Sequence, residues 1–327
     1  MWFSYKIKRL LVISIAIIIL ALAAHEGSEP PPKEAAPILY PTVPADLDPE
    51  ALDHNIDSAN IQPLAAPAKP ASLAKAAVVK PEISAQAYLV ANLDTGEVYI
   101  EHNPTVVFPI ASLTKLITAL VVLHTIPPDQ KMTVNESMLA AYGNAGHLVL
   151  GETLTAKELL YPLLLESSND AAEVLAQSYG YTEFIRLMNA FAGTIGMPST
   201  FFKDASGMSS ANSSNARDLF ALSRHLYRSE KELLDLTRQV TMSVASTSEH
   251  GPHTWKTINP FPLDPHFIGG KTGRTAEARE SMISLFRYND GANSYPIAII
   301  VLRADFTSRE VDSSRLLEKF ITRVRGG

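Results

Sequence analysis

The distribution of proline divides the chain into a part that cannot form a packed core and a part that can. Eleven of the 22 prolines lie between Pro30 and Pro81. Proline fixes φ and removes a backbone donor, so a stretch this rich in proline favours extended chain over helix or sheet. We therefore predict an N-terminal leader at residues 1–24, a disordered Pro/Ala-rich linker at residues 25–82 and one folded domain at residues 83–327.

The leader has the layout of an export signal. Lys6, Lys8 and Arg9 precede an apolar run at residues 10–24, and positive charge before a short apolar segment is typical of secretory signal peptides. The run is shorter than the roughly 20 residues that span a bilayer, which favours cleavage near Ala23 over a retained signal anchor. We expect a periplasmic or otherwise extracytoplasmic protein. If the leader is retained, residues 10–24 form a tether to the inner membrane and the linker is a spacer.

Composition excludes several classes of function. The chain has no cysteine and a formal net charge of −6. Cysteine catalysis, disulfides and cysteine metal sites are therefore excluded, and nucleic-acid binding, which needs a clustered basic surface, is not expected. His250 and His253 are close in sequence but match no metal-binding pattern such as H-E-x-x-H. We expect them in a surface loop without a carboxylate partner, and we predict no metal and no cofactor.

Apolar periodicity in the folded part predicts an α+β fold. Predicted strands occur at both ends of this domain, and helical spacing dominates between them. The expected architecture is one antiparallel sheet shared by the two ends, flanked by helices, with an inserted helical region. Capping boxes are predicted at Thr155–Glu158 and Thr307–Glu310. The strands are expected at residues 84–93, 98–101, 266–275, 281–288 and 295–304, and helices at 112–126, 155–166 with Pro162 as a kink, 171–179, 182–193, 216–227 and from 307 onward.

The first candidate catalytic motif is Ser112-x-x-Lys115. Residues three apart are neighbours on a helix, and a serine hydroxyl needs a neighbouring base to act as a nucleophile at neutral pH. An N-cap serine followed by an exposed lysine is the ordinary alternative. The same spacing occurs at Ser72 and Lys75 within the proline-rich stretch, so the motif alone does not establish a site.

Two further motifs follow in order. Ser167-x-Asn169 lies 55 residues after Ser112, at a break between two apolar helices where polar side chains can face a cleft. Lys271-Thr272-Gly273 lies 104 residues after Ser167 and occurs once in the chain. A helix cap and a salt-bridged strand lysine are the ordinary explanations for these two motifs taken singly.

Jointly the three motifs resemble the penicillin-recognising serine enzymes, whose pattern is S-x-x-K, S-x-N and K-T-G. More narrowly, the chain resembles the low-molecular-mass penicillin-binding proteins, the serine D-Ala-D-Ala carboxypeptidase and endopeptidase family, over about residues 83–327. The resemblance implies a β-lactamase/transpeptidase-like fold and a hydrolase that acts without a cofactor. It also implies peptidoglycan stem peptides as substrates and β-lactam antibiotics as covalent inhibitors.

The resemblance assigns a role to each motif residue. The catalytic residues are Ser112, which becomes acylated, Lys115, which takes its proton, and Ser167, which relays a proton to the leaving amine. The substrate-binding residues are Asn169 for the substrate backbone, Lys271 and Thr272 for its carboxylate, Gly273 for close approach, and the backbone N–H groups of Ser112 and Arg274 for the oxyanion.

Some alternatives stay open. Arg279, which Glu280 follows, stands where the family often has a small residue, and these two charges bear on substrate preference. A serine β-lactamase is disfavoured because residues 196–215 contain no glutamate to activate water. An idle penicillin-binding scaffold or sensor is disfavoured by the complete motif set and by a chain that ends at Gly327 without a signalling domain. That length resembles the endopeptidase-type members, but the motifs do not separate carboxypeptidase from endopeptidase.

Overall fold

A computed structural model describes residues 82–140, 143, 145–291 and 293–326 of the chain. The leader, and the linker apart from Glu82, lie outside the described residues, so their assignment stays a prediction. Among the helices that the structure describes, none is long and apolar enough to cross a membrane.

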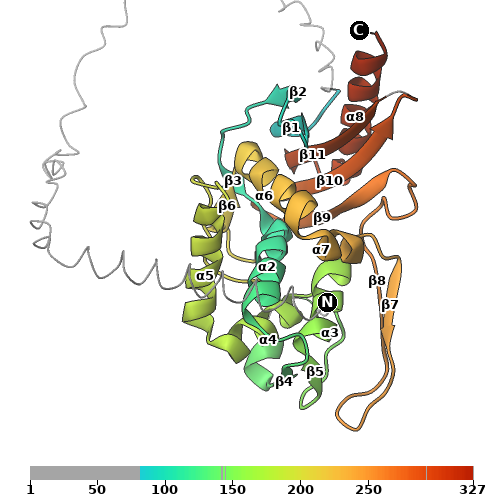
Figure 1. The fold of residues 1–327 in the computed structure, drawn as a ribbon. Helices are drawn as coiled ribbons and strands as arrows, with labels where there is room; N and C mark the ends of the chain where they lie inside the picture. Colours follow the sequence, from blue (N-terminus) through green and yellow to red (C-terminus); the bar gives the residue numbers. More distant parts are fainter. Residues whose placement is uncertain (1–81, 141–142, 144, 292, 327) are drawn as a thin grey trace, which may run out of the picture. The chain divides into compact units, whose positions relative to one another are not determined.

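One five-stranded antiparallel sheet organises the folded part. Its strand order is β2-β1-β11-β10-β9, so strands from both ends of the domain lie side by side, as predicted (Figure 1). Strand β1 pairs with β11 through partners such as Leu89 and Ile300. The strands are β1 (Ala87–Asn92), β2 (Val98–His102), β9 (Phe267–Thr275), β10 (Arg279–Asn289) and β11 (Ser294–Ala304).

Both faces of this sheet are buried, and the alternation of side chains along β11 shows why. Ile297, Ile299 and Val301 belong to one apolar cluster, and Ile300 and Leu302 to the other. Side chains of successive strand residues point to opposite faces, so an apolar run of this kind needs cover on both sides. The terminal helix α8 (Arg309–Gly326) covers one face, and α6 (Ala216–Ser229) lies on the other (Figure 1).

The inserted helical region lies on the α6 side of the sheet, as expected (Figure 1). Its larger apolar cluster joins the helices to the inner face of the sheet, so the candidate motifs sit where the two regions meet. The remaining elements are η1 (Ala111–Thr114), α2 (Lys115–Thr125), η2 (Glu136–Leu139), α3 (Ala156–Tyr161), η3 (Pro162–Glu166), α4 (Asn169–Tyr179), α5 (Tyr181–Thr194), α7 (Lys231–Thr237) and the paired strands β3 (Phe108–Pro109) with β6 (Ser213–Ser214), β4 (Lys131–Thr133) with β5 (Thr153–Thr155), and β7 (Thr241–Val244) with β8 (His253–Lys256).

Helix boundaries depart from the predictions in two places. The box at Thr155 and Glu158 is present, with both reciprocal hydrogen bonds, but α3 ends at Tyr161 and a π-helix carries the chain on from Pro162. Proline has no N–H to continue an α-helical ladder, which explains the change. The helix predicted from Thr307 begins instead, as α8, at Arg309. Ser308 therefore precedes the helix, and the residue three positions after it is Val311, which cannot complete a capping box.

Candidate active site

Ser112 lies in a tight turn rather than in an α-helix, which corrects the prediction. Residues 111–114 form the 3-10 turn η1, and the α-helix α2 begins at Lys115. Ala111 has a left-handed φ of 48°, a conformation that costs a residue with a Cβ some strain. The turn leaves Ser112 half-buried while its neighbours Ala111 and Leu113 are buried. A serine held at a strained turn is typical of a site where the hydroxyl must be presented.

Lys115 is buried directly behind Ser112. Its Nζ donates to Ser112 Oγ at 2.9 Å, to Asn169 Oδ1 at 2.8 Å and to the Ser206 carbonyl at 2.5 Å. Burial lowers the pKa of Lys115 from 10.5 to about 7, while the carboxylates of Asp204 and Glu173 act in the opposite direction. A lysine with such a pKa exists in both protonation states near neutral pH, so it can take a proton from the serine hydroxyl.

The Ser-x-Asn motif connects the other two. Ser167 ends η3 in a left-handed conformation, with φ of 62°, and Asn169 opens α4 after the N-cap Ser168. Asn169 Oδ1 accepts from Lys115, whereas Ser167 Oγ accepts from Lys271 Nζ at 2.8 Å. The left-handed turn at Ser167, between η3 and α4, therefore accompanies two neighbouring polar side chains that bond different lysines.

The Lys-Thr-Gly motif lies on β9, at the edge of the sheet that faces the serine turn. Lys271 is buried, and its Nζ donates to Ser167 and to the Thr272 carbonyl, the latter at 2.9 Å. Burial, together with the nearby charges of Lys115 and Arg309, holds the Lys271 pKa well below its usual value. Thr272 is also buried.

Gly273 brings this strand into contact with the serine turn. A Cβ at this position would lie 2.8 Å from the Ile110 carbonyl oxygen and 3.2 Å from the Ser112 amide nitrogen. Only glycine permits such an approach of two backbones. The three motifs thus meet pairwise: Lys115 bonds Asn169, Lys271 bonds Ser167, and Gly273 abuts the Ser112 backbone.

A loop that contains none of the three motifs, residues 204–212, positions Lys115. Asp204 accepts from the backbone N–H groups of Ser206 (2.9 Å), Gly207 (2.5 Å) and Ser209 (2.6 Å). Asn212 accepts from Asp204 N at 3.1 Å and donates to Thr114 Oγ1 at 3.1 Å. These bonds fix the carbonyl of Ser206 that Lys115 contacts.

The same loop holds two more serine–asparagine pairs with the spacing of Ser167-x-Asn169, and their asparagines have different structural roles. Asn215 caps α6, accepting from Asp218 N at 2.8 Å. Asn212 braces the Lys115 loop, donating to Thr114 Oγ1 and to the Asp204 carbonyl. Asp204 and Asn212 flank the Ser206-Gly207 pair, and this dense run of turn-forming polar residues was the available signal.

Arg309 is a further site residue that the motifs did not indicate. Its Nη1 donates to the Gly273 carbonyl at 3.1 Å and lies 3.9 Å from Glu280 Oε1. Burial lowers the pKa of Arg309 relative to its usual value, with Glu280 opposing the shift. The guanidinium therefore places a positive charge behind the Lys-Thr-Gly strand.

The charged residues after Lys-Thr-Gly are held by the protein itself. Arg279 donates to Asp305 Oδ1 at 2.6 Å, and Glu280 is buried against Arg309. Arg274 is exposed, with its guanidinium 5.3 Å from the centre of the Phe306 ring. Of these side chains, Arg274 is the one that solvent reaches most freely, beside the predicted oxyanion position.

The histidines at the β7–β8 hairpin correct another expectation. His253 Nε2 lies 2.8 Å from Glu152 Oε2, and its ring stacks on Trp255 with centroids 5.1 Å apart. His250 is buried. The predicted surface loop without a carboxylate partner is therefore wrong, because Glu152 is 101 residues away in sequence and reaches His253 only in the fold.

Comparison with known proteins agrees with this arrangement. The profile of the family described as D-alanyl-D-alanine carboxypeptidase matches residues 74–305, well over half of the chain. The chain belongs to this family. Its fold is that of the family's solved members: a D-alanyl-D-alanine carboxypeptidase of Mycobacterium tuberculosis superposes with a TM-score of 0.66 at 27% identity, covering 75% of this chain and 93% of that one. The DD-transpeptidase of Streptomyces K15 superposes at 0.65 and 27% identity, covering 74% and 98%.

Among curated family members, one of the most similar is the D-alanyl-D-alanine endopeptidase of Escherichia coli, 38% identical over 167 residues. That alignment covers 49% of this chain and 54% of the relative. A D-alanyl-D-alanine carboxypeptidase of Mycobacterium tuberculosis is 32% identical over 62% of this chain and 70% of its own length. The chain spans about half the length of the endopeptidases it matches.

Proposed function

We propose that this protein is a serine DD-peptidase that cleaves D-alanyl bonds in peptidoglycan stem peptides through an acyl-Ser112 intermediate. The observation that supports this most directly is the 2.9 Å contact between Ser112 Oγ and the buried Lys115 Nζ, whose pKa is lowered to about 7. Such a pair supplies a nucleophile and its base without a metal or cofactor. Membership of the carboxypeptidase family supports the same chemistry.

The proposed bond changes use these contacts. Ser112 Oγ attacks the carbonyl carbon of the penultimate D-alanine while its proton passes to neutral Lys115 Nζ. The C–N bond then breaks, and the leaving amine takes that proton from Lys115 through Ser167, whose Oγ also accepts from Lys271. Water then attacks the ester and gives a proton to the neutral Lys115, and the acid is released as Ser112 Oγ takes that proton back. Backbone N–H groups of Ser112 and Arg274 are proposed to stabilise the oxyanion, and one such donor is typically worth about 3–4 kcal/mol of barrier.

The charge of the site favours a substrate with a carboxylate beside the scissile bond. Lys271 is buried beside Lys115 and Arg309, and both positive charges depress its pKa. An incoming carboxylate would offset this repulsion, because opposite charge favours the protonated lysine. A terminal D-alanine and a D-alanyl cross-link both present such a carboxylate, so carboxypeptidase and endopeptidase activity are two outcomes of one experiment.

β-Lactams are proposed as covalent inhibitors, since they present a carboxylate and a strained amide to the same residues. Rapid hydrolysis of the resulting ester would need a carboxylate that activates water, and the two carboxylates that act on Lys115 are already engaged in hydrogen bonds. Asp204 is held by three backbone N–H groups, and Glu173 accepts from Gln177 at 2.9 Å. We also propose export, with residues 1–24 as signal or anchor and residues 25–82 as the linker that leads to the catalytic domain.

The test uses the full chain in mild detergent, incubated with monomeric and cross-linked muropeptides and analysed by mass spectrometry. Loss of one terminal alanine identifies a carboxypeptidase, and conversion of dimers to monomers identifies an endopeptidase. Ser112→Ala is expected to lose turnover and labelling by a fluorescent penicillin, whereas Ser72→Ala, at the other serine with the same Ser-x-x-Lys spacing, should behave as wild type.

Three outcomes would count against the proposal. Activity or labelling that survives in Ser112→Ala would show that another residue is the nucleophile. Rapid turnover of penicillin would favour the β-lactamase alternative. Labelling of Ser112 without any muropeptide product would favour the idle scaffold.

A further inference from the structure

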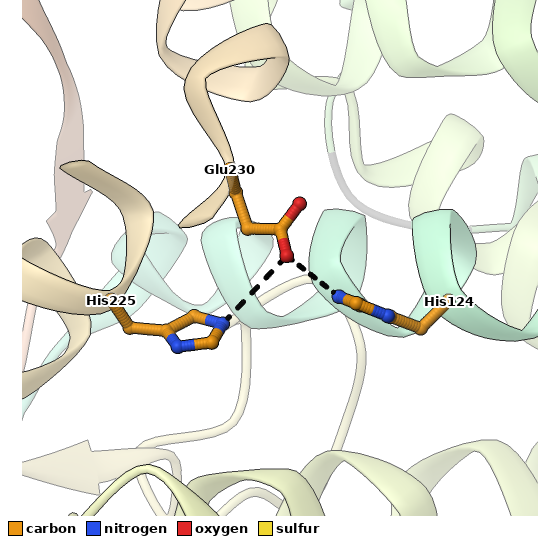
Figure 2. A group of neighbouring side chains, drawn as sticks. All are labelled: His124, His225 and Glu230. Carbon is orange, nitrogen blue, oxygen red and sulfur yellow. Dashed lines mark hydrogen bonds and ion pairs between the residues drawn. The ribbon is translucent and has the colours of Figure 1, made fainter. Parts of the chain in front are cut away.

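A second cluster of chemically active side chains lies away from the serine site, and no motif in the sequence indicated it. His124 is in the last turn of α2, His225 is on α6, and Glu230 follows α6 and precedes α7 (Figure 2). One ligand atom from each residue lies within 4.8 Å of the other two. Within the part of the chain that the structure describes, this is the one group of three or more histidines and carboxylates so arranged.

The three side chains point toward one another around Glu230 (Figure 2). His124 Nε2 lies 2.9 Å from Glu230 Oε1, and His225 Nε2 lies 3.9 Å from the same oxygen. The second separation is too long for a hydrogen bond. His225 Nε2 is buried and has no hydrogen-bond partner in the described structure. The buried nitrogen of His225 therefore faces a carboxylate that already accepts from His124. A bound cation would supply the partner that this nitrogen lacks.

The surroundings hold the two rings in place. Phe191 of α5 contacts both imidazoles, with ring centroids 5.3 Å from His124 and 5.6 Å from His225. Glu230 is buried, while the His124 and His225 side chains keep 17% and 25% of their exposure. The site therefore lies just below the surface, with its carboxylate shielded from solvent and both rings partly exposed.

The donor set fits a first-row divalent cation. Two histidine nitrogens and one carboxylate oxygen form one of the common zinc sets, with bonds of about 2.0–2.2 Å and a fourth position for water. Ligand atoms at such bonds lie about 3.3 Å apart in a tetrahedron, and the observed 2.9 and 3.9 Å bracket this value. Small side-chain rotations would suffice. The His124 proton that now bonds Glu230 would move to Nδ1 or to solvent.

We propose that His124, His225 and Glu230 form a site for Zn²⁺ or a similar divalent cation. The ion would link the C-terminal end of α2 to α6 and to the start of α7. His124 is nine residues beyond Lys115, or about 14 Å along the helix at 1.5 Å per residue, so the ion is not part of the serine chemistry. Helix α7 contacts β9, where Thr237 Oγ1 accepts from Gly270 N at 3.0 Å. The site thus braces α2, which carries Lys115, and α7, which contacts the strand of the Lys-Thr-Gly motif.

The test is a Zn²⁺ titration of the full, untagged chain after chelator treatment, by isothermal calorimetry, together with the absorption spectrum of the Co²⁺ form. One ion per chain and a tetrahedral Co²⁺ spectrum are expected. His225→Gln should weaken Zn²⁺ binding by at least about 100-fold, because even residues that only support ligands contribute about 10- to 100-fold. Zn²⁺ should raise the thermal midpoint of the wild type and not that of the variant.

The matched control is His253→Gln. His253 also lies 2.8 Å from a glutamate, Glu152, but among the described residues no third ligand atom joins that pair. This variant should bind Zn²⁺ as the wild type does. Because Glu230 is buried, His124→Gln serves as the second test variant, and circular dichroism verifies that each variant is folded. Three outcomes would overturn the proposal: no Zn²⁺ binding by the wild type, unchanged binding in both His225→Gln and His124→Gln, or equal weakening in His253→Gln. None of these outcomes bears on the serine site.

Discussion

The rate at which β-lactams acylate Ser112 should rise with pH and level off above about pH 7. Only neutral Lys115 can accept the serine proton, and burial lowers the pKa of Lys115 to about 7. Below that pKa the neutral fraction falls about tenfold for each pH unit, so the rate at about pH 5 should be about 1% of the plateau. A lysine at its usual pKa would be neutral in only about 1 molecule in 3,000 at pH 7.

The assay measures the second-order rate constant for labelling by a fluorescent penicillin between about pH 5 and about pH 9, with Ser112→Ala as background. Circular dichroism at each pH verifies that the fold persists. Deprotonation of Lys115 also removes one of the charges that depress the Lys271 pKa, so Lys271 keeps its own proton more readily as Lys115 loses its proton.

A matched variant tests the electrostatic origin of the profile. The Glu173 carboxylate raises the pKa of Lys115 against the effect of burial, so Glu173→Gln should move the rising limb to lower pH while leaving the plateau in place. A rate that is flat from about pH 5 to 8, or that still climbs above about pH 9, would refute the assignment of Lys115 as base. A shift of the limb to higher pH in Glu173→Gln would refute its electrostatic explanation.

The same pKa carries a consequence for stability. Between pH 7 and 10.5 the unfolded chain holds a proton on Lys115 that the folded chain has lost, so this residue makes the fold more stable as pH rises. Below pH 7 Lys115 is protonated in both states, and the folded protein bears the full free-energy cost of burying its charge. A depression from 10.5 to about 7 corresponds to about 5 kcal/mol. The protein thus maintains its base at the expense of its own stability.

Three substitutions test the supporting structure. Gly273→Ala should slow acylation by about 100-fold, because its Cβ would displace the Ser112 turn, and misplacement by about 1 Å can cost that much; wild-type labelling would refute this contact. Asp204→Ala removes three hydrogen bonds from backbone N–H groups and should lower the free energy of unfolding by about 3 kcal/mol. The same variant should also acylate more slowly. Asp312→Ala removes bonds to Ser84 and Ala85 and should lower stability by about 3 kcal/mol in denaturant unfolding, with labelling unchanged below the transition.

Local patterns in the sequence predicted the elements well. Ile297, Ile299 and Ile300 marked β11 because a strand buried on both faces must be apolar at every position. Thr155 and Glu158 marked the start of α3 because a capping box depends on residues three apart. Where the prediction failed, at Ser112 and Pro162, contacts with other elements or a missing N–H converted α-helix to 3-10 or π geometry.

What the sequence by itself determined was which residue types occur in which order: a serine and a lysine three apart, a serine and an asparagine after a helix break, and a glycine that follows Lys-Thr. Only the tertiary structure decided that Lys115 is buried, that Asp204 and Asn212 brace it, that Arg309 stands behind Gly273, and that His124, His225 and Glu230 converge. The physical reason is that a pKa or a ligand set depends on desolvation and on distances of a few ångströms between residues that can lie more than a hundred positions apart in the sequence. Neither desolvation nor such distances are recorded in local spacing.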